Sequence, residues 1–293
     1  MSLTSLAFAA VFAAFMALAL FRHPLWGLYA YVALFYLHPP SRWWGEMLPD
    51  LRWALVAALV TLIGSMRLPR DTTRPSWIST TPAKLLIAYT AWCAIQMAWA
   101  LDRELHLELT VLFAKYVLLF YLVYRLVDTE EKVRDFLLVH VGGCLYFGYL
   151  AYSMEVSGRL EGVGGPGVDE ANALAMQMGT GVAIAAMLFL AEKGWRRWLA
   201  FLALPFMLNT MVLAGSRGAF VALVAAGLVL WWLKPAVYAK RFYLYAALGV
   251  VLFGILAHET FWERIQTIRT AVNAPEELDT SALSRLELID AQW

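Results

Sequence analysis

An arginine stands among small residues between two apolar runs, in the segment Leu213-Ala-Gly-Ser-Arg-Gly-Ala-Phe220. An arginine next to hydrocarbon costs roughly a few kcal/mol, so it normally has an anionic partner or a water-filled cavity. Gly215, Ser216 and Gly218 leave the backbone open to a ligand. We therefore expect Arg217 to bind an anion at the mouth of a helical bundle, with Ser216 beside it in the binding site. A lipid-linked phosphate is the anion that this setting favours.

Small residues also recur every four positions through this segment, at Ala214, Gly218, Ala222 and Ala226. Stripes of this kind let helix backbones approach closely in membranes. The stripe predicts tight packing of the helix that follows Arg217.

Further cations are candidates for the same site. Lys115 lies about two turns inside its apolar run, roughly 10 Å from the end, where an ionisable group is usually functional unless it snorkels to the surface. Arg159 lies in a glycine-rich loop and binds either a ligand or the carboxylates of Glu155 or Glu161. Arg285 lies on an amphipathic segment, where a solvated face is the ordinary alternative. Guanidinium forks with a lysine suit a diphosphate.

Polar groups and metal ligands complete the survey. Asn172 begins an apolar run and bonds either to neighbouring helices or to sugar hydroxyls. No His, Asp or Glu groups fall at ligand spacing on one helix face, and the sequence has no Asp-x-Asp pair. We expect no metal, no cofactor and no nucleic acid to take part, so arginines would neutralise a phosphoryl leaving group.

The composition predicts a polytopic helical membrane protein. Of the 293 residues, 61% are hydrophobic and 15% are charged, whereas soluble domains are about 45–50% apolar and about 25% charged. Runs of spanning length are roughly 17–25 residues. Such runs, some of them short, lie near Leu3–Phe21, Leu25–His38, Leu51–Met66, Ala83–Leu101, Leu107–Val127, Phe136–Met154, Ala171–Ala191, Trp198–Leu213, Ala219–Leu233 and Phe242–Ala257. We expect an all-α bundle of about ten spans.

The connecting loops alternate in charge. Basic loops contain Arg67 to Lys84, Arg125 to Arg134, Lys193 to Arg197, and Lys234 to Arg241, and acidic loops lie between them. The positive-inside rule makes the basic loops cytoplasmic. The Arg217 turn is then external. The orientation of the amino terminus stays open, because it depends on whether Leu25–His38 spans.

The chain changes character after residue 257. We expect 1–257 to form the bundle and 258–293 to begin a large periplasmic loop, with a helix over Leu283–Trp293. That helix has no stop signal, which predicts that the protein continues past Trp293.

Three segments together carry a family resemblance. They are Leu-Ala-Gly-Ser-Arg217-Gly-Ala, Asp169-Glu-Ala-Asn172-Ala-Leu-Ala after a Gly-Pro-Gly loop, and Phe261-Trp-Glu-Arg-Ile-Gln-Thr-Ile268 followed by Ser281-Ala-Leu-Ser-Arg285. Their order and topology resemble the O-antigen ligase and O-antigen polymerase superfamily of bacterial inner-membrane glycosyltransferases, from about Lys115 onward. The third segment is typical of the ligase branch, which includes O-glycosylation ligases.

The resemblance implies a reaction. The donor would be a glycan on undecaprenyl diphosphate and the acceptor a sugar hydroxyl of the lipid A core, in a metal-independent, inverting transfer on the periplasmic side. Arg217 and Arg285 match the family's essential arginines, which hold the diphosphate, and Lys115, Arg159, Asn172 and Ser216 would bind substrate around them. The resemblance places the general base, a histidine, beyond Trp293.

Other functions use the same features. An O-antigen polymerase or a protein O-glycosylation ligase would share the donor and differ in the acceptor. A flippase for lipid-linked glycans belongs to a different class, and it predicts an internal repeat and cations at mid-membrane.

Overall fold

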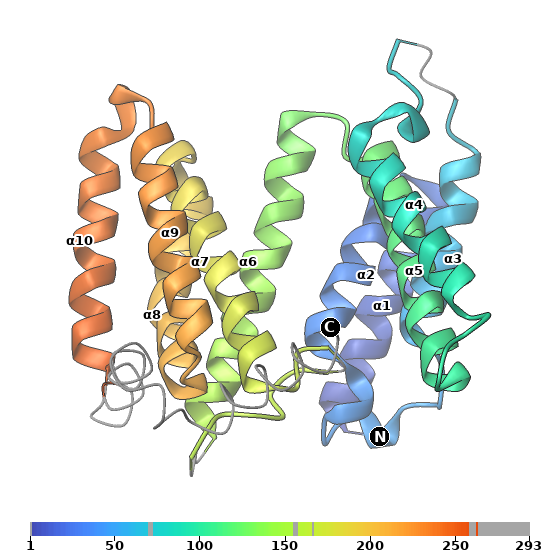
Figure 1. Ribbon diagram of the computed structural model, residues 1–293, viewed down its shortest axis with the longest axis horizontal. Coiled ribbons are helices and arrows are strands. Elements are labelled where there is room, and N and C mark those ends of the chain that lie inside the picture. The colour runs from blue at the N-terminus through green and yellow to red at the C-terminus, as the bar shows by residue number, and fades with distance from the viewer. Residues whose placement is uncertain (1, 70–72, 155–157, 166, 258–261, 263–293) are drawn as a thin grey trace. The chain divides into compact units, whose positions relative to one another are not determined.

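The protein is described by a computed structural model that covers residues 2–69, 73–154, 158–165, 167–257 and 262. Every regular element in these residues is helical, which confirms the all-α prediction. The α-helices are α1 (Leu3–Phe21), α2 (Leu25–Leu37), α3 (Trp53–Met66), α4 (Thr81–Gln96), α5 (Arg103–Leu126), α6 (Glu130–Ser153), α7 (Ala171–Ala191), α8 (Gly194–Ala214), α9 (Arg217–Leu233) and α10 (Ala239–Leu256). Short 3₁₀ helices are η1 (Pro39–Ser41), η2 (Gly45–Met47), η3 (Trp77–Ser79) and η4 (Ala236–Tyr238). Figure 1 labels the α-helices and colours them along the chain from blue to red.

In the part of the chain that the structure describes, six helical segments are long and apolar enough to cross a membrane, which is the pattern of a multi-pass membrane protein. They are α1, α5, α6, α7, α8 and the segment Ala236–Leu256 that contains α10. Helices α3 and α9 are apolar but shorter. Helix α2 has 13 residues, or about 20 Å of length, against a hydrocarbon core of about 30 Å. The count of about ten spans stays a prediction.

The chain divides into two compact units, Met1–Phe136 and Leu137–Trp293. The predicted boundary after residue 257 stays a prediction, because 258–261 and 263–293 lie outside the described residues.

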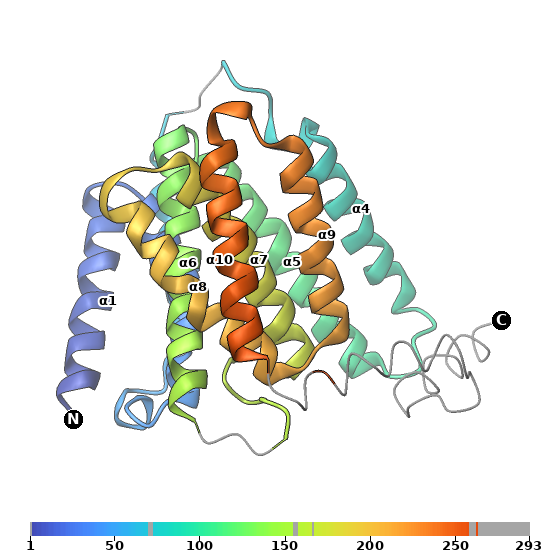
Figure 2. The same cartoon turned by 90° about the vertical axis from the view of Figure 1, so that its left-hand side faces the viewer.

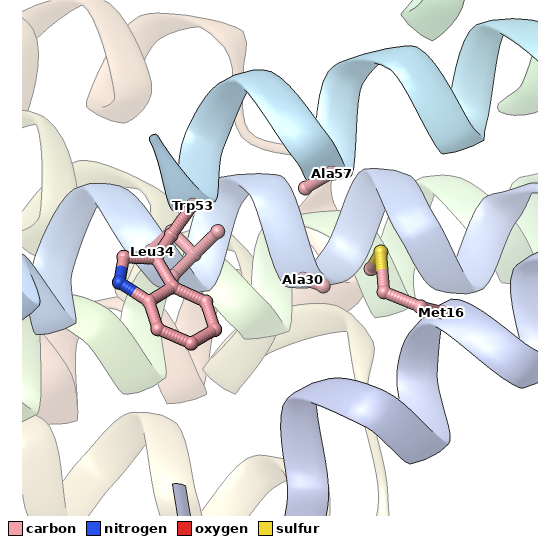
Figure 3. Packing of buried hydrophobic residues seen from close by; sticks show 5 residues of the cluster. All are labelled: Met16, Ala30, Leu34, Trp53 and Ala57. Carbon is pink, nitrogen blue, oxygen red and sulfur yellow. The ribbon is translucent and has the colours of Figure 1, made fainter. Parts of the chain in front are cut away.

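The first unit is built around α1, α2 and α3. Met16, Ala30, Leu34, Trp53 and Ala57 form one buried cluster at their contact. Figure 3 shows Trp53 beside Leu34, and Ala57 of α3 facing Ala30 of α2, with Met16 reaching in from α1. Small side chains at this crossing let the helices approach closely.

A second cluster in this unit sets the direction of α2. Leu25 and Leu28, at the start of α2, are buried against Leu122 and Leu126 at the end of α5. The start of α1 lies at the other end of α2, where the Ser5 hydroxyl donates a 2.7 Å hydrogen bond to the Trp44 carbonyl. Within this unit, the amino terminus and the end of α5 therefore lie at opposite ends.

The second unit packs α6, α8, α9 and α10 around α7. Helices α7 and α8 share the most extensive contact, and α7 buries the most residues of any helix in this unit. Figure 2 shows the α7–α8 and α9–α10 connections at one end of the unit and the loop between α6 and α7 at the other.

The predicted small-residue stripe is packed only in part, since Ala214 is buried and Ala226 is half-buried. Gly218 and Ala222 are exposed, and a Cβ added to Gly218 would meet nothing within 4 Å. Ala219 is the buried residue of this helix. Gly218 and Ala222 therefore lie on an outward face of α9.

Candidate functional site

Local backbone chemistry places Arg217 at the start of α9. Gly215 ends α8 in the left-handed conformation with φ 58°, which glycine adopts without strain. Ser216 caps α9, and its hydroxyl accepts a 3.4 Å hydrogen bond from the amide of Ala219. Arg217 is the first helical residue, and its side chain is half-buried.

Ser216 is thus foremost a helix cap. Its side chain is buried, with 6% of its surface exposed, and its oxygen accepts the Ala219 amide. In this bond the oxygen is the acceptor, so the hydroxyl can still donate one hydrogen bond, and the predicted contact with substrate would use that donor. The contact itself stays a prediction.

The loop before α7 is tied to the end of α8. The Arg159 guanidinium donates through Nε to the Ala214 carbonyl (3.2 Å) and through Nη2 to Asn172 Oδ1 (2.9 Å). The Leu160 amide donates to the Leu213 carbonyl (3.1 Å). A cation and an amide thereby satisfy carbonyls at the negative end of the α8 dipole.

Buried apolar side chains hold this loop in place. Leu160, Val163 and Val168 have at most 5% of their surface exposed. The backbone passes so closely at Gly164 that an added Cβ would lie 2.6 Å from the Val168 carbonyl oxygen. The loop is a built part of the second unit, and it joins Arg159 and Asn172 to the turn that carries Arg217.

The two arginines have different surroundings. Arg159 bonds to a main-chain carbonyl and to Asn172, which gives it a positioning role at this turn, and its predicted contact with substrate stays a prediction. The Arg159 guanidinium does not bond to Glu161 in the described part of the loop, and Glu155, the other predicted acidic partner, lies outside the described residues. Arg217 stands at the positive end of a helix dipole, where backbone amides and a guanidinium together suit an anion.

Lys115 and Arg285 were also predicted for the site. Lys115 belongs to the first unit, where it is exposed and halfway along α5, about 18 Å from the first residue of that helix. This depth exceeds the expected 10 Å because α5 begins at Arg103, earlier than the apolar run. Arg285 lies outside the described residues.

The described residues contain no group of three or more His, Cys, Asp or Glu side chains that could hold a metal ion. The predicted independence from metals is untested by this and stays a prediction.

Residues 202–293 match the family model of the O-antigen ligase. This segment, less than a third of the chain, is similar to the O-antigen ligase superfamily. This confirms the resemblance, and it implies a membrane enzyme of the O-antigen ligase or polymerase type that acts on a lipid-linked glycan. No curated protein and no solved structure matches the chain at a significant level.

The matched segment begins within α8 and includes the turn, Arg217, α9 and α10. Arg159 and Asn172 precede it. The bond between these two residues was missed by sequence reasoning, which weighed acidic partners for Arg159. Arg159 and Asn172 stand before and after one glycine-rich loop, and this placement could have suggested the bond between them.

Proposed function

We propose that the protein transfers an O-antigen glycan from undecaprenyl diphosphate to a sugar hydroxyl of the lipid A core, at the periplasmic face of the bacterial inner membrane. The observation that carries this proposal is the position of Arg217 within the matched segment, at the amino-terminal end of α9. A cation there can meet the diphosphate of a donor whose lipid lies in the bilayer.

The reaction needs charge stabilisation on the leaving group. The acceptor oxygen forms a bond to the anomeric carbon, the bond from that carbon to the diphosphate oxygen breaks, and the configuration inverts. The hydroxyl proton passes to a general base. Arg217 and Arg285 neutralise the departing diphosphate without a metal, aided by the α9 dipole. Lys115 is a further proposed contact to the donor.

The lipid tail needs an apolar surface beside the diphosphate. Gly218 and Ala222 lie on the outward face of α9, directly after Arg217. Their small side chains leave room for a polyprenyl chain along this helix. These two residues thus support a lipid-facing groove wall.

The charge of the second unit supports a periplasmic site. Cations gather at the end opposite to the Arg217 turn, where Arg241 donates to the Leu190 carbonyl (3.1 Å) and Arg197 lies 4.6 Å over the Phe189 ring. By the positive-inside rule such an end faces the cytoplasm.

Reconstitution of the full-length protein tests the proposal. The protein is supplied with a lipid-diphosphate glycan and, separately, with a truncated lipid A-core acceptor, a second lipid-linked glycan, and a protein acceptor. We expect glycan transfer to the lipid A-core acceptor, and the same rate with a chelator present. Transfer to the lipid-linked glycan alone would make the enzyme a polymerase, and transfer to the protein alone an O-glycosylation ligase. Transbilayer movement of the donor without transfer to any acceptor would support the flippase.

A further inference from the structure

The first unit contains a cavity of about 830 Å³ at the end where α5 finishes. It lies between the carboxyl-terminal ends of α3 and α5, the turn between α1 and α2, and η3. This volume is in the range of small-molecule sites, roughly 300–1,000 Å³. The polar part of its lining includes His23, Arg74, Arg125, Trp77, Tyr121 and Tyr124.

Two guanidinium groups line this cavity. Arg125 donates through Nη2 to the carbonyls of Leu68 (2.8 Å) and Pro69 (3.0 Å), while its Nε is buried and has no hydrogen-bond partner in the described part of the chain. Arg74 donates to the Tyr124 carbonyl at 3.4 Å, a long contact, and lies 5.1 Å over the Tyr124 ring. Guanidinium groups bind phosphate oxygens through charge-assisted hydrogen bonds, so these two groups suit an anionic ligand.

The remaining polar groups agree with an anion. His23 Nδ1 accepts a 3.2 Å hydrogen bond from the Leu25 amide, so the proton of the neutral ring is on Nε2 and can be donated. Burial, followed by the charge of Lys132, lowers the pKa of His23 and keeps the ring neutral at pH 7. The carboxylate of Asp128, which also lines the cavity, is paired with Lys132.

Apolar and aromatic groups in the lining indicate which kind of molecule carries the anion. Met66, Leu68 and Ile78 contribute to the lining, and the Trp77 and Tyr121 rings contact edge to face at 5.5 Å. Trp and Tyr concentrate at the level of lipid headgroups. A cavity at helix ends with a basic and an apolar wall fits a phosphate that carries acyl chains better than a soluble one.

We propose that this cavity binds the headgroup phosphate of an anionic phospholipid, with Arg74 and Arg125 as its cationic ligands. Basic pockets between transmembrane helices on the cytoplasmic side bind such headgroups. The cavity lies in the first unit, outside the segment matched to the O-antigen ligase, and the inference does not rest on the proposed reaction.

Native mass spectrometry of the purified full-length protein tests this site. The protein is titrated with dioleoyl phosphatidylglycerol and with dioleoyl phosphatidylcholine, which share their acyl chains. We expect tighter binding of phosphatidylglycerol. Arg74→Ala and Arg125→Gln should each weaken phosphatidylglycerol binding by about fivefold and leave phosphatidylcholine unchanged. Lys84→Ala is the matched control, because Lys84 is an exposed cation near the same end, at the start of α4 and outside the lining.

The outcomes separate the alternatives. Equal binding of the two lipids, or an equal loss in Lys84→Ala, would assign the effect to general surface charge and overturn the proposal. Displacement of phosphatidylglycerol by equimolar glycerol 1-phosphate would show that the site takes a soluble phosphate ester, which also overturns it. Arg125 holds two backbone carbonyls, so if Arg125→Gln does not fold, Arg74→Ala decides the result.

Discussion

At the scale of single residues, two arginines at one end of the second unit have different surroundings. The Arg159 guanidinium donates hydrogen bonds to the Ala214 carbonyl and to Asn172. Arg217 starts α9, directly after the Ser216 cap. The first therefore shapes the turn that presents the second.

Substitution of Arg159 tests this positioning role. Arg159→Ala removes both bonds, which is about 1–3 kcal/mol of stability, and should lower both Tm and the rate of glycan transfer in part. Asn172→Ala removes one of the two bonds and should have a smaller effect on both. Thermal unfolding and the transfer assay on the same samples measure this. An unchanged Tm with complete loss of transfer would contradict the positioning role and indicate that Arg159 contacts the substrate directly.

The sequence could place Arg217 but not the partners of Arg159. Gly215 and Ser216 are local signals for the end of one helix and the start of the next, so the helix boundary at Arg217 follows from neighbouring residues. The Ala214 carbonyl is far from Arg159 in sequence, and a main-chain acceptor leaves no mark in the side-chain pattern.

At the scale of elements, glycines set how closely α6 approaches its neighbours. A Cβ on Gly148 would lie 2.6 Å from Phe206 Cβ and 2.9 Å from the Phe206 carbonyl carbon in α8. A Cβ on Gly181 of α7 would lie 2.7 Å from Cys144 Sγ in α6. The hydrophobic effect does not drive helices together within a membrane. Close packing at small residues stabilises these helix contacts instead.

A pair of substitutions in α6 tests this contact. Gly148→Ala should destabilise the protein by about 1–3 kcal/mol, because backbone atoms of α8 must move. Gly142→Ala lies in the same helix, where an added Cβ meets nothing within 4 Å, and should be neutral or stabilising by up to about 1 kcal/mol. Chemical unfolding in detergent compares the two. Equal stability of the two variants would rule out a close α6–α8 contact.

Helix positions were predictable because each apolar run marks one helix. α1 and α7 begin and end at the expected residues. α5 begins earlier than its apolar run because Asp102 caps it, accepting a 3.0 Å hydrogen bond from the Leu105 amide. The exposure of Gly218 and Ala222 in α9 was not predictable, since the spacing of small residues does not distinguish a helix contact from a lipid contact.

At the scale of the whole molecule, the proposed orientation depends on charge at the helix ends. The exposed Glu161 lies in the loop beside the Arg217 turn, and the exposed Lys240 lies near the start of α10, at the opposite end of the second unit. The positive-inside rule predicts that they face different compartments.

Cysteine labelling tests the orientation. In spheroplasts, Glu161→Cys should react with a membrane-impermeant maleimide, and Lys240→Cys should react only after lysis. The native Cys93 and Cys144 are buried, so the unsubstituted protein is the background control. The reverse labelling pattern would place the site in the cytoplasm and contradict the proposed reaction.

The most direct test of the central claim is whether Arg217 holds the diphosphate of the donor. Affinities for undecaprenyl diphosphate and undecaprenyl monophosphate are measured on the purified wild type, Arg217→Ala, Arg217→Lys and, as a control at the other end of the unit, Lys240→Ala. We expect the wild type and Lys240→Ala to prefer the diphosphate, Arg217→Ala to bind it about tenfold more weakly or worse, and Arg217→Lys to fall between them because a lysine lacks the bidentate fork. Unchanged diphosphate affinity in Arg217→Ala would contradict the account.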